Sequence, residues 1–166
     1  MDSDFWLIQK MKNGDEQAVD VFVNKYYPMI MRYCRLHIKD CGHAEDITQE
    51  TFEHFFRTFN RYQHYGKAAN YLYVIAANAC KDYYRKKDVP VAETPLEQSQ
   101  YSEEYFEEYV DVHLALDSLP QEIREVAVLF FCQEIKQKEI ARILGIGLPL
   151  VKYRIRKARE LLRRLI

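Results

Sequence analysis

The stretch Lys136–Ile166 reads KQKEIARILGIGLPLVKYRIRKARELLRRLI, and its pattern decides the fold of the C-terminal part of the chain. Apolar residues at helical spacing predict a short helix over Gln137–Leu144, which Gly145 can end because glycine readily adopts a positive φ. Ile146 fills the turn, and Pro149 suits the first turn of a second helix. Two helices, a glycine turn and a basic second helix are the elements with which a helix-turn-helix enters the major groove.

The second helix is expected to bury one apolar face and to expose a basic one. Its buried side consists of apolar residues, namely Leu150 or Val151, then Ile155, Ala158, Leu161 and Leu162. Its exposed side holds Lys152, Tyr153, Arg154, Arg156, Lys157 and Arg159. A simpler alternative is a solvated basic helix that closes a small bundle. The turn glycine, the apolar plug and the positive charge occur together, which favours the helix-turn-helix.

The positive charge of this tail is hidden in the total, because the 166-residue chain has 24 Lys and Arg, 25 Asp and Glu and a net charge of −1. Residues 1–90 carry +1 (13 basic, 12 acidic), residues 91–118 carry −8 (no basic, eight acidic) and residues 119–166 carry +6 (11 basic, five acidic). The total argues against a protein that coats nucleic acid by charge alone. The segments instead predict an acidic middle and a basic DNA-binding tail.

The acidic middle also marks a domain boundary. Residues 87–109, KDVPVAETPLEQSQYSEEYFEEY, contain two prolines, a run of acids and no long apolar periodicity. This composition is typical of a flexible, self-repelling linker. We therefore predict one domain over residues 1–88 and another over 110–166, joined by an acidic linker over 89–109.

The N-terminal domain is also predicted to be helical. Asp15 can cap a helix that Pro28 can break or kink before Met29–Ile38 continues. A further helix from His43 places its aromatic and polar residues on opposite sides, and Ala68–Lys87, without Pro or Gly, predicts another. Because no segment alternates like a strand, we expect an all-α protein of two small domains, an N-terminal bundle of three to four helices and a C-terminal helix-turn-helix domain.

The C-terminal domain is expected to begin with a capping box, because Ser118 and Gln121 lie three apart around Pro120 and precede an apolar run. The longest apolar run, Val126–Cys132, has seven residues, whereas a membrane span needs about twenty. We therefore expect no membrane insertion. The N-terminus lacks the basic region of a secretory signal, so the four cysteines are expected to be reduced thiols in the cytoplasm.

Taken in order, these motifs resemble the extracytoplasmic-function (ECF) sigma factors of the sigma-70 family, which give bacterial RNA polymerase its promoter specificity. GDEQAVDVFVNKYYPMIMRY (14–33) resembles the first conserved helix, AEDITQETFEHFF (44–56) the polymerase-binding signature, and YLYVIAANACKD (71–82) the helix that melts and reads the minus-ten element. LDSLPQEIREVAVL (116–129) and EIARILGIGLPLVKYRIRKARELL (139–162) resemble the fourth region and its helix-turn-helix. The resemblance implies an RNA polymerase sigma factor that directs core polymerase to promoters and initiates transcription, not an enzyme, with no cofactor or metal.

One polar helix face is a candidate for binding core polymerase. It consists of residues at positions i, i+3, i+4 and i+7, namely Asp46, Gln49, Glu50 and Glu53. The resemblance implies that this face docks on the β′ clamp helices, with the β flap as a second polymerase contact. From the residues alone, a merely solvated polar face would be favoured.

The loop Asn60–Lys67 and the helix Tyr71–Tyr84 hold six tyrosines, and aromatic rings beside cations suit single-stranded DNA. The resemblance implies a pocket for a flipped base of the minus-ten element. The candidate base contacts are Asn60, Tyr62, Asn70, Tyr71 and Asn78, and the candidate phosphate contacts are Lys81, Arg85, Lys86 and Lys87. Tyr71 is equally well explained as a core residue. Val74 and Ala77 depart from the family, which often has Arg at these positions.

The second helix of the helix-turn-helix is the candidate reader of the minus-thirty-five element. We expect Lys152, Arg154 and Lys157 mainly on phosphates, with Arg159 as a further basic contact, while Tyr153 and Arg156 reach bases. The residues Pro149 and Leu150 replace a Gly-Thr pair common in the family, which leaves the base preference open.

Two other functions would account for parts of this sequence. A DNA-binding regulator would share the helix-turn-helix, but it needs neither the acidic face nor the aromatic helix and would usually dimerise on a palindrome. An enzyme or metal protein finds no support in the five histidines, which lack paired ligand spacing and are expected at the surface or at caps.

The acidic linker either mimics nucleic acid in the RNA exit path or is a solvated tether. The resemblance also implies an anti-sigma partner.

Overall fold

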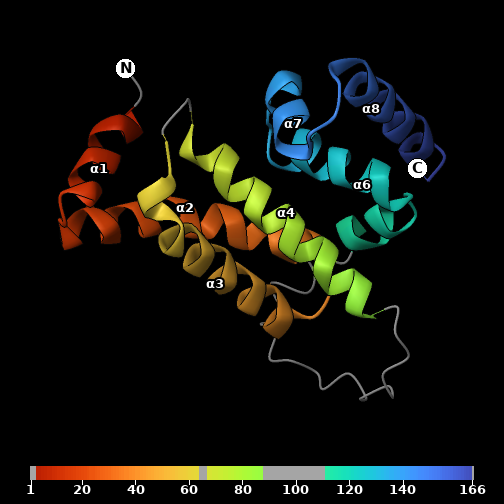
Figure 1. Ribbon diagram of the computed structural model, residues 1–166. Helices are drawn as coiled ribbons and strands as arrows, with labels where there is room; N and C mark the ends of the chain where they lie inside the picture. Colours follow the sequence, from red (N-terminus) through yellow and green to blue (C-terminus); the bar gives the residue numbers. More distant parts are fainter. Residues whose placement is uncertain (1–2, 64–66, 88–110, 166) are drawn as a thin grey trace.

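The computed structural model describes residues 3–63, 67–87 and 111–165, and the predicted linker over residues 89–109 lies outside them. Every regular element in these ranges is a helix, and no strand occurs in them (Figure 1). The predicted all-α fold is therefore confirmed, with one group of helices in residues 3–87 and another in residues 111–165. These groups are called the N-terminal part and the C-terminal part below.

Helices fill the N-terminal part. In chain order they are α1 (Ser3–Lys12), α2 (Glu16–His37), α3 (Cys41–Arg57), the short 3₁₀ helix η1 (Phe59–Arg61) and α4 (Ala68–Lys87). The carboxylate of Asp15 caps α2 as predicted, accepting from the backbone N–H groups of Gln17 and Ala18 at 3.0 and 3.3 Å. Pro28 does not break this helix, which continues through it to His37.

An aromatic core joins α2, α3 and α4. Phe22 of α2 stacks on Phe55 of α3 with ring centroids 4.9 Å apart, and Tyr33 of α2 meets Tyr73 of α4 edge-on at 5.4 Å. All four side chains are almost completely buried. Aromatic pairs of this kind supply large apolar area with defined geometry, so they fix how the three helices cross.

The C-terminal part begins with a helix over residues 111–117, followed by α6 (Gln121–Ala127), the π-helix η2 (Val128–Cys132), α7 (Gln137–Leu144) and α8 (Leu148–Arg163). Gly145 ends α7 with φ +65°, and Pro149 lies in the first turn of α8, as predicted. The predicted capping box is wrong. Ser118 instead donates to the carbonyl of Ala115, and α6 begins without a side-chain cap.

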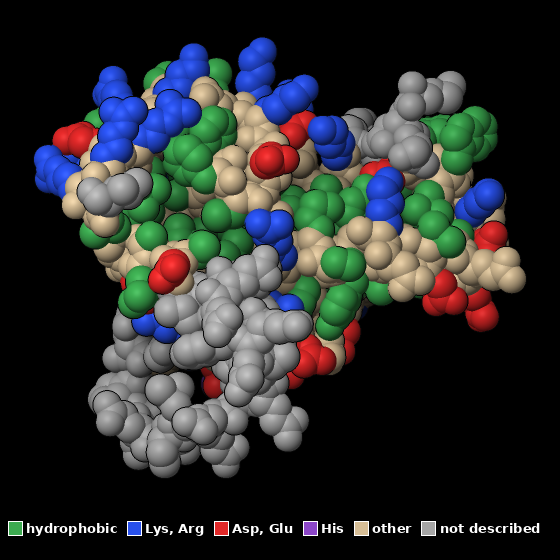
Figure 2. Space-filling model, turned by 180° about the vertical axis from the view of Figure 1, so that it is seen from behind, with side chains coloured by type: hydrophobic (Ala, Val, Ile, Leu, Met, Phe, Trp, Pro, Cys, Tyr) green, Lys and Arg blue, Asp and Glu red, His purple; other side chains and the backbone are tan. Residues whose placement is uncertain are grey.

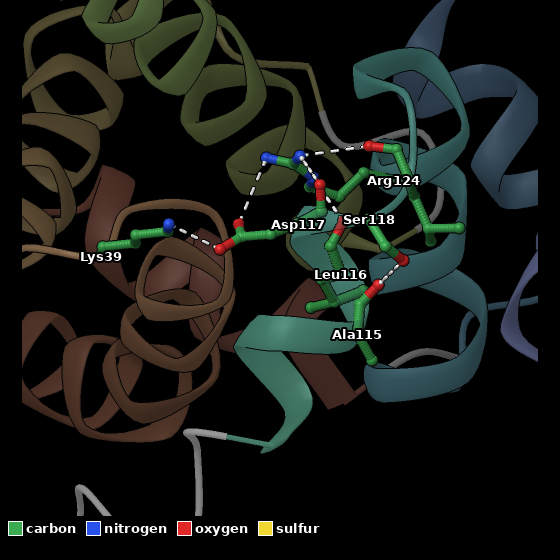
Figure 3. A network of polar contacts seen from close by, with 7 residues as sticks. Lys39, Ala115, Leu116, Asp117, Ser118 and Arg124 are labelled. Atoms are coloured by element: carbon green, nitrogen blue, oxygen red, sulfur yellow. Dashed lines mark hydrogen bonds and ion pairs between the residues drawn. The ribbon is translucent and has the colours of Figure 1, made fainter. Parts of the chain in front are cut away.

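The side chain of Arg124 stabilises the turn before α6. Its guanidinium donates to the backbone carbonyls of Leu116, Asp117 and Leu119 at 2.9, 3.3 and 3.1 Å (Figure 3). One long side chain thus satisfies carbonyls at the end of the preceding helix. A short-range sequence pattern does not contain this contact, because the donor lies five to eight residues away.

The two parts pack against each other. In Figure 1, α6 and α7 lie beside α4. Ion pairs join Lys39 to Asp117 at 2.6 Å (Figure 3), Lys67 to Glu139 at 3.3 Å and Lys81 to Glu125 at 3.8 Å. The hydroxyl of Tyr73 donates to the side-chain carbonyl of Gln133 at 3.3 Å. The division into two parts was predictable, whereas this contact was not.

His37 corrects the expectation of surface histidines. It is only 5% exposed at the junction of the two parts, and its ring centroid lies 4.5 Å from that of Tyr33. Burial, helped by the nearby Arg124 and His113, lowers the pKa of His37 to about 3. This histidine is therefore neutral in the folded protein and belongs to its packing.

Candidate functional site

The polar face of α3 is exposed along its length. Asp46, Gln49, Glu50 and Glu53 all lie at the surface. The opposite face of α3 buries apolar side chains, and the hydroxyls of Thr48 and Thr51 donate to carbonyls one turn back at 2.7 and 2.8 Å. Because the buried face fixes the rotation of the helix, the four polar residues point away from the core. This arrangement presents three carboxylates to a partner on one side of the molecule.

Two of the candidate minus-ten residues are packed together. Tyr62 is buried, and its ring centroid lies 5.3 Å from that of Tyr71 and 5.4 Å from that of Phe55. The hydroxyl of Tyr71 shares a hydrogen bond with Thr58 at 3.2 Å. Asn60, by contrast, is exposed in η1 beside this cluster. The two tyrosines thus form a wall of packed rings, and the side chain of Asn60, from the neighbouring helix η1, is exposed to solvent.

The remaining minus-ten candidates divide along α4. Asn78, Arg85 and Lys86 are exposed, and the described residues place Arg85 within 3.9 Å of Asp82. No side-chain placement is described for Lys87, which ends the helix.

Asn70 and Lys81 instead face the C-terminal part. Asn70 lines a groove of about 340 Å³ between the two parts, together with Gln133 and Glu139. Lys81 is half-buried and pairs with Glu125, a carboxyl group whose pKa is raised by burial. DNA that reaches these two side chains must therefore compete with the C-terminal part.

The recognition helix α8 buries Val151, Ile155 and Ala158 and exposes its other face. Lys152, Tyr153, Arg156 and Arg159 are exposed, in agreement with the sequence, whereas Leu150 is exposed and Val151 takes the core position. Figure 2 shows Lys and Arg side chains gathered over the end of the molecule that contains the helix-turn-helix. This surface carries the positive charge that a DNA-binding helix needs.

Several cations of α8 are engaged within the protein. The side chain of Arg154 is only 15% exposed and lies 3.4 Å from the carboxylate of Glu122, so its predicted exposure is wrong. Lys157 lies 3.6 Å from Glu160. The guanidinium of Arg159 lies over the rings of Phe130 and Phe131. Lys152 and Arg156 are also exposed, and the guanidinium of Arg156 lies over the ring of Tyr153, 5.6 Å from its centroid.

Comparison with known proteins identifies the family. Residues 22–89 match the model of sigma-70 region 2, and residues 109–162 match that of sigma-70 region 4. The ECF RNA polymerase sigma factor SigW of Bacillus subtilis is 31% identical over 95% of this chain and 93% of its own length. This chain belongs to the ECF sigma factors of the sigma-70 family. It is a promoter-specific RNA polymerase sigma factor, as its motifs implied.

Solved structures agree with this ECF sigma factor in fold. CnrH, in complex with the cytosolic domain of CnrY, superposes with a TM-score of 0.79 at 23% identity, over 99% of this chain and 97% of that chain. The sigma factor RpoE of Bartonella quintana, in complex with the anti-sigma factor NepR, gives 0.69 at 20% identity, over 89% and 95%. The region 2 match contains the acidic face of α3 and the candidates on α4, and the region 4 match contains α6, α7 and α8 up to Leu162.

Sequence analysis of this sigma factor missed the acidic residues that cover α4. Glu125 and Glu139 pair with Lys81 and Lys67, yet in the sequence only Glu139 is an acid among basic residues, whereas Glu125 lies between the acids Glu122 and Glu134. Glu139 carries one signal, which is that it departs from the charge of its surroundings, and Glu125 carries none. Within the described ranges, no three His, Cys, Asp or Glu residues gather as a metal site, and no helix is long and apolar enough to cross a bilayer.

Proposed function

We propose that this sigma factor binds core polymerase through the acidic face of α3, formed by Asp46, Gln49, Glu50 and Glu53. The observation that supports this assignment is the exposure of all four side chains opposite a well-packed apolar face. A row of carboxylates suits a basic partner such as the β′ clamp helices, because complementary charge steers docking and sets its register. We assign a second contact, with the β flap, to the C-terminal part.

We further propose that the N-terminal domain, residues 1–88, captures the melted minus-ten element. The packed rings of Tyr62 and Tyr71 form the wall against which a flipped base stacks, and Asn60 at its edge supplies hydrogen-bonding groups. Asn70 and Asn78 are further base contacts. The cations Lys81, Arg85, Lys86 and Lys87 hold the phosphates.

The C-terminal domain, residues 110–166, reads the duplex of the minus-thirty-five element with α8. Lys152 and Lys157 contact phosphates, and Tyr153 and Arg156 reach bases. Arg154 and Arg159 contribute after they leave their partners within the protein, Glu122 and the rings of Phe130 and Phe131.

An anti-sigma protein is the proposed regulator, and it would cover the surfaces that bind polymerase. The support comes from proteins of the same fold, because RpoE of Bartonella quintana is described in complex with the anti-sigma factor NepR. The sigma factor itself performs no catalytic step and acts in the cytoplasm, where core polymerase works.

Run-off transcription with bacterial core polymerase and a library of promoters tests the assignment of both domains. The expected result is initiation at a subset of promoters that share minus-ten and minus-thirty-five elements, and only when the sigma factor is added. Binding to closed duplex as a dimer, without promoter-dependent initiation, would show instead a simple DNA-binding regulator.

A pair of charge reversals tests the polymerase contact separately. Glu50→Lys is expected to weaken capture of core polymerase, because it places a cation in the acidic face. Asp20→Lys is the matched control, since Asp20 is also exposed but lies on α2. Equal capture by both variants would contradict the assignment of the α3 face.

A further inference from the structure

The first half of α8 carries an apolar ridge on its exposed side. Leu150 is 38% exposed and Tyr153 is 49% exposed, and Arg156 follows three residues later on the same side. The opposite face is fixed by the buried residues Val151 and Ile155. An exposed leucine among so many cations is not explained by packing within the described residues.

The helix start offers little capacity for hydrogen bonds through its side chains. Its first three residues, Leu148, Pro149 and Leu150, are all apolar. In a helix-turn-helix, the N-terminal residues of the second helix contact the edges of the bases. In the major groove, the 5-methyl group of thymine is the one apolar group that a base pair presents.

Tyr153 is held in place for such a contact. The guanidinium of Arg156 lies over its ring, 5.6 Å from the ring centroid. Three residues of helix rise by about 4.5 Å, and successive base pairs are about 3.4 Å apart. Leu150 and Tyr153 therefore face the same base pair or two adjacent ones.

We propose that Leu150 and Tyr153 read the minus-thirty-five element through the 5-methyl groups of one or two adjacent thymines. This inference deepens the proposed function, on which it rests, by naming the base and the group that is recognised. The side chains at the start of α8 then recognise the base by an apolar contact and not by a hydrogen bond from a hydroxyl or an amide. Neither cytosine nor uracil carries the methyl group that this contact needs.

Replacement of thymine by deoxyuridine tests the inference, because it removes only the methyl group. The holoenzyme, reconstituted with the full chain, is first used to select a promoter from a library with a randomised minus-thirty-five element. Each thymine of that element is then replaced singly, and binding is measured by competition. At one or two positions we expect about fourfold weaker binding, the factor for one buried methyl group.

Protein variants show which side chains sense the methyl group. Leu150→Ala and Tyr153→Ala are expected to bind thymine and deoxyuridine promoters equally at those positions, whereas Tyr153→Phe keeps the fourfold ratio because it keeps the ring. Leu165→Ala is the matched control, since Leu165 is exposed just beyond the other end of α8 and should leave the ratio unchanged.

Three results would overturn the inference: no deoxyuridine effect at any position, a ratio that persists in both alanine variants, or loss of the ratio in Tyr153→Phe. A holoenzyme that selects no promoter at all would instead refute the proposed function, and the inference with it. The two failures are distinguishable, because only the second abolishes initiation.

Discussion

A change of pH from 7 to 5 is predicted to destabilise the folded protein through His37. The pKa of this histidine falls from its ordinary value of 6.5 to about 3, chiefly because the ring is buried. The folded state thus favours the neutral ring, while the unfolded chain accepts a proton below pH 6.5. The contribution of the neutral His37 ring to the free energy of unfolding is fully present above pH 6.5, and it is lost as the pH falls towards 3.

The size of this loss follows from the structure. At pH 5 the unfolded histidine is mostly protonated and the folded one is not, so the loss depends on the distance from pH 5 to 6.5. That distance of about 1.5 pH units corresponds to about 2 kcal/mol. The loss of unfolding free energy at pH 5 is nearly the same whether the pKa of His37 in the folded protein is 2 or 4. The ring nitrogen Nε2 has no hydrogen-bond partner among the described residues, and Arg124 and His113 lie nearby, so a proton there finds no compensating group.

Urea unfolding at pH 7 and pH 5 measures this effect by comparison with His37→Gln, which cannot titrate. Wild type should lose about 2 kcal/mol more than the variant between the two pH values, while His54→Gln, at an exposed histidine, should behave like wild type. In the wild-type protein, the NMR signals of the His37 ring should not titrate between pH 7 and 5. Equal losses in wild type and His37→Gln, or a ring that titrates near pH 6.5, would refute the reasoning.

Four further changes have defined outcomes. Phe55→Ala removes a buried ring from the aromatic core and should lower the unfolding free energy by about 3–5 kcal/mol, measured by urea denaturation. Gly145→Ala should cost about 1–2 kcal/mol in the same assay, since φ is +65° but an added Cβ meets no atom within 4 Å. Lys152→Ala should weaken binding to all promoters alike and reduce the salt slope of binding by about one. Glu125→Gln should strengthen binding of the full chain to single-stranded minus-ten DNA about two- to fivefold, because it releases Lys81 from an ion pair worth up to ~1 kcal/mol.

Local signals made much of the fold predictable. The bounds predicted for α4 and α7 agree with the structure, because each helix is delimited by residues close in sequence, and the φ of Gly145 is required by the turn that follows α7. The exposed face of α3 followed from spacing alone, since the buried aromatic residues fix the rotation of the helix. The sequence was sufficient to predict helix bounds and exposed sides where these depend only on one helix face and on the residues at its own termini.

The failures share a different cause. The capping box failed because the hydroxyl of Ser118 donates to the carbonyl of Ala115 instead of accepting from a backbone N–H group of α6, while Arg124 satisfies other carbonyls of the same turn. The exposure of Arg154 failed because Glu122, 32 residues earlier in the chain, lies within 3.4 Å of it. Both errors concern hydrogen-bond partners that helix periodicity does not encode, a local carbonyl for Ser118 and a carboxylate brought close by tertiary packing for Arg154.

The contact between the two parts gives the uneven charge of the chain a structural role. The C-terminal part is basic overall, yet its carboxylates Asp117, Glu125 and Glu139 turn towards lysines of the N-terminal part. Partly exposed ion pairs of this kind are worth only about 0–1 kcal/mol each. Three such pairs therefore set the register of the two parts more than they hold them together, and buried contacts such as that of His37 contribute more. Under the proposed function, Lys81 exchanges the carboxylate of Glu125 for a DNA phosphate at little cost.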